Sequence, residues 1–202
     1  MPTLDELWKS SDSKSWHDAL QRYWDFVTPV NLALERRMEK LDINDLRLLN
    51  SKGWFDFLHD EYFRWKYTAV NRYATTTRSL NRYAEEGLLD KLYNIKQQLL
   101  SLNTSDIGSA LDKAKEIRGL GTAGASGLLA LMYPSVFGTV DQFVVKALRS
   151  VEGLPEASIL ARMNENSLTV QDGVALIRIL QRKAIEINRL FRQKNGHHGR
   201  WT

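Results

Sequence analysis

Apolar residues recur at helical spacing along almost the whole chain, and this periodicity restricts the fold more than any other feature. Residues three, four and seven apart share one face of an α-helix. An apolar stripe of this kind runs through the last long segment, at Val170, Val174, Ile177, Ala184, Ile187 and Phe191. The nearest approach to strand alternation is VFGTV (136–140), which is too short to form a useful strand. We therefore predict an all-α protein of about ten helices.

Capping residues mark where several of these helices begin and end. Thr28 followed by Pro29 is a cap with proline at the first helical position, and Thr169 is a cap for the last long helix. Gly87 lies between two periodic segments and is a typical helix stop. The connections between predicted helices are short. The residues after Lys194 have the composition of a loop.

The composition is that of an ordinary globular protein, with 43% hydrophobic and 26% charged residues among 202. A chain of this length buries enough surface to need no covalent staple. It has no cysteine, which excludes disulfides, thiolate metal sites and cysteine nucleophiles. Residues 1–16 lack the apolar centre of a signal peptide, and no apolar run reaches transmembrane length. We expect a cytoplasmic protein.

The net charge of +4 is distributed unevenly along the chain. Between Tyr62 and Ala84 there are five cations and no acid, and between Arg182 and Thr202 there are six Lys or Arg residues and one acid. Local basic regions of this kind attract polyanions, as a uniformly spread charge would not. The charge pattern favours a polyanionic partner such as nucleic acid.

The stretch from Ile117 to Leu148 carries the features that suggest chemistry. Gly119 and Gly121 lie between two predicted helices, where glycines allow a tight turn whose N–H groups point outward and bind anions such as phosphate. Asp141 follows 20 residues after Gly121, at the start of another amphipathic segment. Taken singly, the glycines also suit an ordinary helical turn, and Asp141 also suits an ordinary N-cap.

The whole stretch resembles one known motif. Residues 117–125, Ile-Arg-Gly-Leu-Gly-Thr-Ala-Gly-Ala, look like the hairpin of the helix-hairpin-helix DNA glycosylase superfamily, whose pattern includes Gly-apolar-Gly and a later alanine. Residues 134–141, Pro-Ser-Val-Phe-Gly-Thr-Val-Asp, resemble the superfamily's Gly/Pro-rich loop that ends in a catalytic aspartate. Residues 142–148 are similar to the helix that follows. The match covers about 32 residues.

This resemblance implies an all-α fold of two helical lobes, with double-stranded DNA lying across the cleft. Asp141 would stabilise the cationic sugar as the base leaves and would help water to attack the anomeric carbon, a role that suits a fixed carboxylate. The hairpin would bind a backbone phosphate, often with a monovalent cation, through Gly119, Leu120, Gly121, Thr122, Ala123 and Gly124. Arg118 would add a phosphate contact.

Ala123 narrows the implied activity. It lies where lysine stands in superfamily members that also cleave the strand through a Schiff base. The implied type is a monofunctional glycosylase, which hydrolyses the bond to a damaged, mismatched or modified base. No cofactor or metal is expected, and the absence of cysteine excludes the superfamily's iron–sulfur cluster. The enzyme would be a monomer without a membrane partner, associated with the nucleoid when bound to DNA.

The resemblance also implies how the chain is divided. Residues 1–202 would form a single helix-hairpin-helix unit, with the hairpin and catalytic loop at 113–148. Helices in 1–112 and 149–193 would form the scaffold, and 194–202 a tail.

Aromatic and basic residues interleave between Tyr62 and Tyr73. A glycosylase stacks its extruded base on an aromatic ring and reads the base edge by hydrogen bonds. The candidates for this pocket are Tyr62, Trp65, Tyr67 and Asn71, and the candidates for phosphate contacts are Arg64, Lys66 and Arg72. Alternatively, the rings anchor the core while the cations extend to solvent. Asp60 or Glu61 could supply a second acid that protonates the leaving base.

Two other functions are compatible with these features. The chain could be a catalytically silent relative that binds DNA through the hairpin, with salt-dependent affinity and no base release. It could instead be an unrelated all-α interaction protein in which the hairpin only turns the chain. DNA binding at low salt separates this last hypothesis from the other two.

Overall fold

The structure, a computed structural model, describes residues 2–195 and is helical throughout that range, with no strand among these residues. This confirms the predicted all-α class. The helices are more numerous and shorter than predicted, because α3 (Tyr23–Phe26) and α7 (Phe63–Lys66) have only four residues each. None of the described helices is both long enough and apolar enough to cross a membrane.

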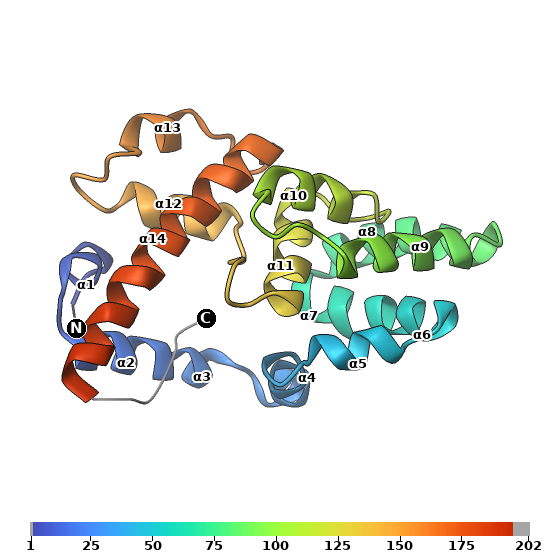
Figure 1. Cartoon of the computed structure of the whole chain (residues 1–202), viewed down its shortest axis with the longest axis horizontal. Helices are drawn as coiled ribbons and strands as arrows, with labels where there is room; N and C mark the ends of the chain where they lie inside the picture. Colours follow the sequence, from blue (N-terminus) through green and yellow to red (C-terminus); the bar gives the residue numbers. More distant parts are fainter. Residues whose placement is uncertain (1, 196–202) are drawn as a thin grey trace.

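One group of helices combines the beginning of the chain with its later part (Figure 1). It contains α1 (Leu4–Lys9), α2 (Ser13–Gln21), α3, α12 (Gln142–Arg149), α13 (Ala157–Arg162) and α14 (Val170–Asn195). The Glu152 amide donates to Asp5 Oδ1 at 2.8 Å, and Lys183 Nζ lies 5.3 Å and 5.5 Å from the ring centres of Trp8 and Trp16. Helices α1 and α2 therefore pack with the C-terminal ones, and α3 leads from α2 to α4 (Pro29–Glu39), where Arg36 lies over the Trp24 ring.

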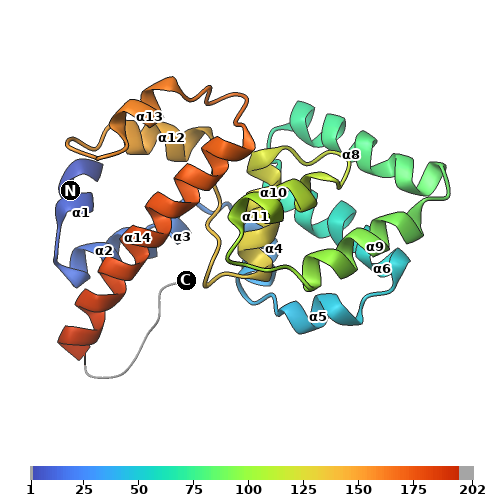
Figure 2. The same ribbon diagram turned by 45° about the horizontal axis from the view of Figure 1, so that its top comes forward.

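The second group surrounds one apolar helix, α11 (Thr122–Met132), most of whose residues are buried. Its other members are α4 (Pro29–Glu39), α5 (Ile43–Leu48), α6 (Ser51–Asp56), η1 (Phe57–Tyr62), α7, α8 (Val70–Glu85), α9 (Leu89–Leu100) and α10 (Ile107–Lys115). The N-terminal part of α14 contacts α10 and α11, while the same helix also contacts α2 (Figure 2). Helix α14 therefore joins the two groups around one continuous core.

Helices α6 and α7 are parts of one continuous helical segment. The sequence did not predict the π-helical section in its middle. Between them, η1 has π-helical hydrogen bonds, and the caps on either side keep helical backbone angles. A π-helical segment changes the angular register of the side chains that follow it, and such segments often occur at functional sites. Tyr62 lies at the end of this segment and Lys66 follows it, and both pack against α11.

The predicted helix boundaries at Gly87 and Thr169 are confirmed. Gly87 follows α8 with a φ of 67°, in the left-handed region. The Thr169 hydroxyl accepts a hydrogen bond from Asp172 N at 3.1 Å, and Asp172 Oδ2 accepts one from Thr169 N at 2.9 Å, which completes the cap of α14. Helix α14 runs to Asn195, so the predicted tail begins in helix, and its remaining residues, 196–202, lie outside the described range.

Candidate functional site

The hairpin turn between α10 and α11 is held against α7 and α8. Gly119 has a φ of 96°, and a Cβ there would lie 2.6 Å from the carbonyl oxygen of Thr76 and 3.0 Å from Phe63 Cε2. The Tyr67 hydroxyl donates to the Gly119 carbonyl at 3.3 Å. Only glycine fits here, because both the backbone angle and the close approach of α8 exclude a side chain.

The N-terminus of α11 presents N–H groups that nothing in the described chain satisfies. Gly121 is exposed, no side chain caps the helix, and no described oxygen accepts from the amides of Thr122, Ala123 or Gly124. The Thr122 hydroxyl donates instead to the Leu168 carbonyl at 2.8 Å. Unpaired N–H groups and the positive end of the helix dipole together attract an anion.

Asp141 lies at the start of α12 with its carboxylate fixed by that helix. Its Oδ1 accepts hydrogen bonds from Phe143 N at 2.9 Å and Val144 N at 3.1 Å. The loop before it is tied to α11, because Ser126 Oγ accepts a hydrogen bond from Val140 N at 3.0 Å. The N-cap interpretation of Asp141 is therefore confirmed, and the cap leaves Oδ2 without a hydrogen bond from the described residues.

Lys66 is the cation nearest to this carboxylate. Its Nζ lies 3.8 Å from Asp141 Oδ2, and the two side chains are 10% and 30% exposed. The lysine passes over Gly127 of α11, where a Cβ would lie 3.3 Å from Lys66 Cδ. Burial lowers the pKa of the Lys66 ammonium, and the negative charge of Asp141 acts in the opposite direction. The structure thus pairs Lys66 with Asp141, whereas the sequence suggested a phosphate contact.

The four residues predicted for a base pocket have separate hydrogen-bond partners, although the ring centres of Tyr62 and Trp65 are 6.0 Å apart. Tyr62 is fully buried and its hydroxyl donates to the Gly124 carbonyl, so it is a core residue and burial raises the pKa of its phenol. Trp65 Nε1 donates to Glu35 at 2.9 Å. Asn71 is exposed at the beginning of α8, where it accepts from Arg72 N. The hydrogen-bonding groups of Tyr62 and Trp65 are therefore engaged within the protein.

Tyr67 is the member of that set that lines a cavity, a small one of about 210 Å³. Arg64 lines the same cavity, with Asn31, Thr68, Val70 and Tyr73. Burial raises the pKa of Tyr67 to about 12, and the nearby Arg72 acts to lower it. Because Tyr67 also bonds the carbonyl of Gly119, this cavity and Arg72 lie close to the hairpin.

The predicted phosphate-binding cations fall into two kinds. Arg118 forms an ion pair with Glu86 at 2.7 Å and lies over the Tyr83 ring, so its charge is already compensated. Arg64 and Arg72 are exposed and form no ion pair with any described residue. The same holds for Arg78 and Arg82 on α8, which belong to the acid-free stretch of the sequence.

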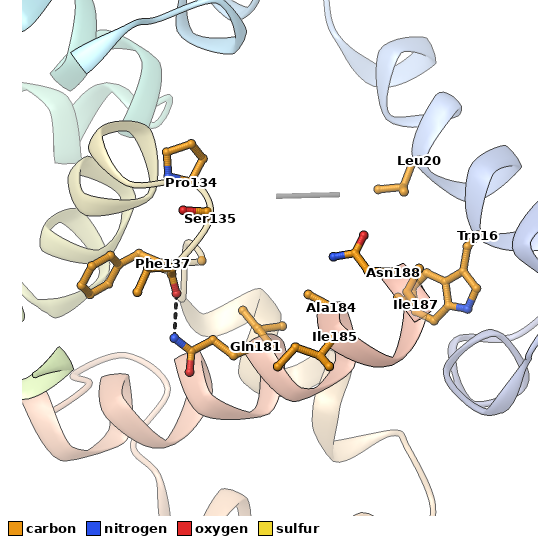
Figure 3. A pocket seen from close by; sticks show the side chains of 13 residues that line it. Trp16, Leu20, Pro134, Ser135, Phe137, Gln181, Ala184, Ile185, Ile187 and Asn188 are labelled. Carbon is orange, nitrogen blue, oxygen red and sulfur yellow. Dashed lines mark hydrogen bonds between the residues drawn. The ribbon is translucent and has the colours of Figure 1, made fainter. Parts of the chain in front are cut away.

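A larger cavity, of about 580 Å³, opens between α2, the 134–138 loop and α14 (Figure 3). Trp16 and Leu20 face it from α2, and Gln181 on its floor donates to the Val136 carbonyl at 2.8 Å. Asp141 lines neither this cavity nor the smaller one. The sequence did not predict this cavity, because its walls come from three segments that lie far apart in the chain and that no local pattern connects.

Within residues 2–195, no group of three or more His, Asp or Glu side chains is arranged to hold a metal ion. No protein-family model matches the chain, and neither the curated proteins nor the solved structures provide a match.

Proposed function

We propose that this chain is a monofunctional DNA N-glycosylase that hydrolyses the bond between deoxyribose and a damaged, mismatched or modified base. The observation that carries the proposal is the Asp141 carboxylate. One of its oxygens is fixed by two amides of α12, the other has no hydrogen bond from the described residues, and the side chain is 30% exposed. Such a preorganised anion can stabilise the positive charge that develops on the sugar as the base leaves.

The proposed reaction uses water as the nucleophile. Breaking the bond between C1′ and the base leaves a cationic sugar, which lies beside Asp141 Oδ2 and is stabilised by its charge. Water then adds to C1′ and loses a proton, which yields an abasic site. Ala123 stands on α11 where a strand-cleaving relative would carry lysine, so we expect no strand cleavage.

Double-stranded DNA is the proposed partner, and the hairpin is its proposed anchor. The unpaired amides of Thr122, Ala123 and Gly124 suit a backbone phosphate, and Arg64 and Arg72 lie on the neighbouring helices without acid partners. A monovalent cation bound by hairpin carbonyls belongs to the same proposal. One copy of the chain carries both the hairpin and Asp141, so we propose that it acts as a monomer.

Base release from defined duplexes tests the catalytic proposal. The protein is incubated with oligonucleotides that each carry one altered base, and alkali then converts abasic sites to strand breaks. We expect Asp141→Asn to lower the single-turnover rate at least about 100-fold, as loss of one transition-state contact typically does. The substitution preserves the cap of α12, because an Asn oxygen can accept the same amide bonds.

Asp42→Asn is the matched control for this experiment. Asp42 caps α5 by accepting from Asn44 N at 2.8 Å, so its variant makes the same chemical change away from the hairpin. We expect the control to keep the wild-type rate. Unchanged activity in Asp141→Asn would reject the catalytic role of this residue.

A catalytically silent DNA-binding protein is the second candidate. Two observations favour it, namely that Lys66 already faces the Asp141 carboxylate and that Asp141 lines neither cavity. This candidate predicts salt-dependent binding to duplex DNA without base release from any oligonucleotide. Absence of binding even at low salt would reject both candidates and leave an all-α interaction protein.

A further inference from the structure

Hydrolysis of the glycosidic bond to a neutral base needs a proton for the leaving base. The two acids that the sequence suggested for this role have other partners than Asp141. Asp60 Oδ1 contacts His59 Nδ1 at 2.7 Å, and Glu61 forms an ion pair with Arg37 at 3.1 Å. Within the described chain, the partners of the Asp141 carboxylate are two backbone amides and Lys66, and none of them is a second carboxyl group. Among residues 2–195, the Lys66 ammonium is the one group with a transferable proton that pairs with Asp141.

The position of Lys66 is built by the fold rather than by a flexible surface side chain. The lysine is 10% exposed and comes from α7, directly after the π-helical segment. Gly127 makes room for it on α11, because a side chain there would contact Lys66 Cδ at 3.3 Å and the Tyr62 hydroxyl at 2.8 Å. A long side chain held by packing delivers its ammonium to one place at little entropic cost.

The distance between the two charges suits a shared substrate. Lys66 Nζ and Asp141 Oδ2 are 3.8 Å apart, which is too long for a strong hydrogen bond between them. A sugar whose C1′ lies against Oδ2 would place its base within a few ångströms of Nζ, since a single C–N bond such as the glycosidic one is about 1.5 Å long. The ammonium could then donate to a ring nitrogen or oxygen of the base.

The electrostatic surroundings support proton donation. Burial disfavours the charged form of Lys66 and lowers its pKa, which makes the ammonium a stronger acid than an exposed lysine. The negative charge of the fixed Asp141 carboxylate acts in the opposite direction and keeps the proton on Lys66 before the base leaves. A catalytic acid is most effective when its pKa approaches the working pH.

We propose that Lys66 is the general acid that protonates the leaving base, an inference that rests on the proposed glycosylase function. The bond between C1′ and the base nitrogen breaks, and its electron pair remains on the base. The base receives the Lys66 proton, water supplies the oxygen that binds C1′, and the proton lost by water passes to solvent. Lys66 recovers its proton from solvent, so the net reaction is hydrolysis.

The absence of cysteine makes a chemical test possible, because a single cysteine placed at 66 is the only thiol in the protein. Lys66→Cys removes the ammonium, and 2-bromoethylamine then converts the thiol to a lysine-like side chain that bears a primary ammonium. Lys66→Arg provides a charge that does not give up its proton. Mass spectrometry measures the modification, and circular dichroism measures folding.

Single-turnover base release is measured on the duplex that the wild type processes fastest. We expect Lys66→Cys and Lys66→Arg each to lower the rate at least about 100-fold, within the range of general-acid contributions. Aminoethylation of Lys66→Cys should restore the rate to within about tenfold of the wild type. Lys146→Cys on α12 is the matched control, since Lys146 is exposed and pairs with Glu165, and its rate should stay unchanged.

The possible outcomes separate this inference from the function on which it rests. No base release by the wild type from any duplex rejects the glycosylase function and the acid together. Base release that survives in Lys66→Arg shows that charge alone is sufficient and rejects the acid. A borohydride-trapped covalent adduct that depends on Lys66 would also reject it, because the lysine would then act as a nucleophile. The general-acid role is also rejected if the Lys66→Cys variant is folded and fully aminoethylated but its rate of base release is not restored.

Discussion

The two hairpin glycines serve different physical purposes. Gly119 has a positive φ and lies so close to the Thr76 carbonyl that a Cβ would overlap it. Gly121 has a φ of −88° and no atom within 4 Å of the position of a Cβ. Gly119 is therefore required by folding, whereas the small size of Gly121 only leaves the N-terminus of α11 open to solvent.

This difference predicts unequal costs for the same substitution. We expect Gly119→Ala to lower the free energy of unfolding by at least about 2 kcal/mol, because it combines a strained φ with a backbone clash. Gly121→Ala should change it by less than about 1 kcal/mol. Urea denaturation followed by circular dichroism measures both variants. Equal stabilities for the two would contradict the packing described for the turn.

At the scale of the element, α11 links the core to the candidate site. Its middle is buried on all sides, its first residues offer unpaired amides, and it contacts both Lys66, through Gly127, and the loop before Asp141, through Ser126. A helix in this position cannot shift without moving the hairpin and the carboxylate together. The site geometry is therefore a property of this one helix and the elements packed on it.

One substitution can provide the missing side-chain cap at the N-terminus of α11. Gly121→Asp places a carboxylate at the N-cap, where it accepts from the free amides and should stabilise the protein by about 0.5 to 1 kcal/mol. The same carboxylate would repel a phosphate and occupy its donors, so we expect at least a tenfold loss of affinity for duplex DNA. Thermal denaturation and fluorescence anisotropy measure the two effects, and Gly121→Ala is the control. Unchanged affinity in a folded Gly121→Asp would exclude the hairpin as the DNA anchor.

At the scale of the whole molecule, exposed cations without an acid partner gather on two neighbouring helices, α7 and α8. Many cations elsewhere in the described chain have an acid partner, as Arg182 has in Glu156 and Arg149 has in Glu165. On α7 and α8, four exposed arginines have no ion-pair partner among residues 2–195. Uncompensated charge beside the hairpin is the arrangement that a phosphate backbone would neutralise.

Neutralising part of this charge should reduce the salt dependence of binding. Each phosphate contact contributes about 0.9 to the slope of log affinity against log salt, so Arg72→Gln, Arg78→Gln and Arg82→Gln together should lower that slope by up to about 3. Fluorescence anisotropy titrations at several salt concentrations between about 50 and 200 mM give this slope. A control with the same change in net charge neutralises three exposed cations that do have acid partners, Lys14, Arg36 and Lys52. An equal reduction in the control would show that only net charge matters.

The sequence by itself determined the all-α class and several helix boundaries, because these depend on local rules. Apolar spacing fixes which residues face a core, and Gly87 and Thr169 act on the backbone groups next to them. The same local chemistry placed Asp141 at a helix N-cap. These rules did not predict the π-helical segment before Lys66, because the spacing of apolar residues does not reveal a single inserted residue.

Only the tertiary structure decided which distant residues meet. It placed Lys66 beside Asp141, buried Tyr62 against α11, and packed α1 and α2 with the last helices. These contacts join residues more than 60 positions apart, and they depend on how helices pack rather than on the residues' neighbours in the chain. A lysine in a basic stretch has the same local sequence whether it faces solvent or a carboxylate. Its environment depends on which face of the helix packs against the core.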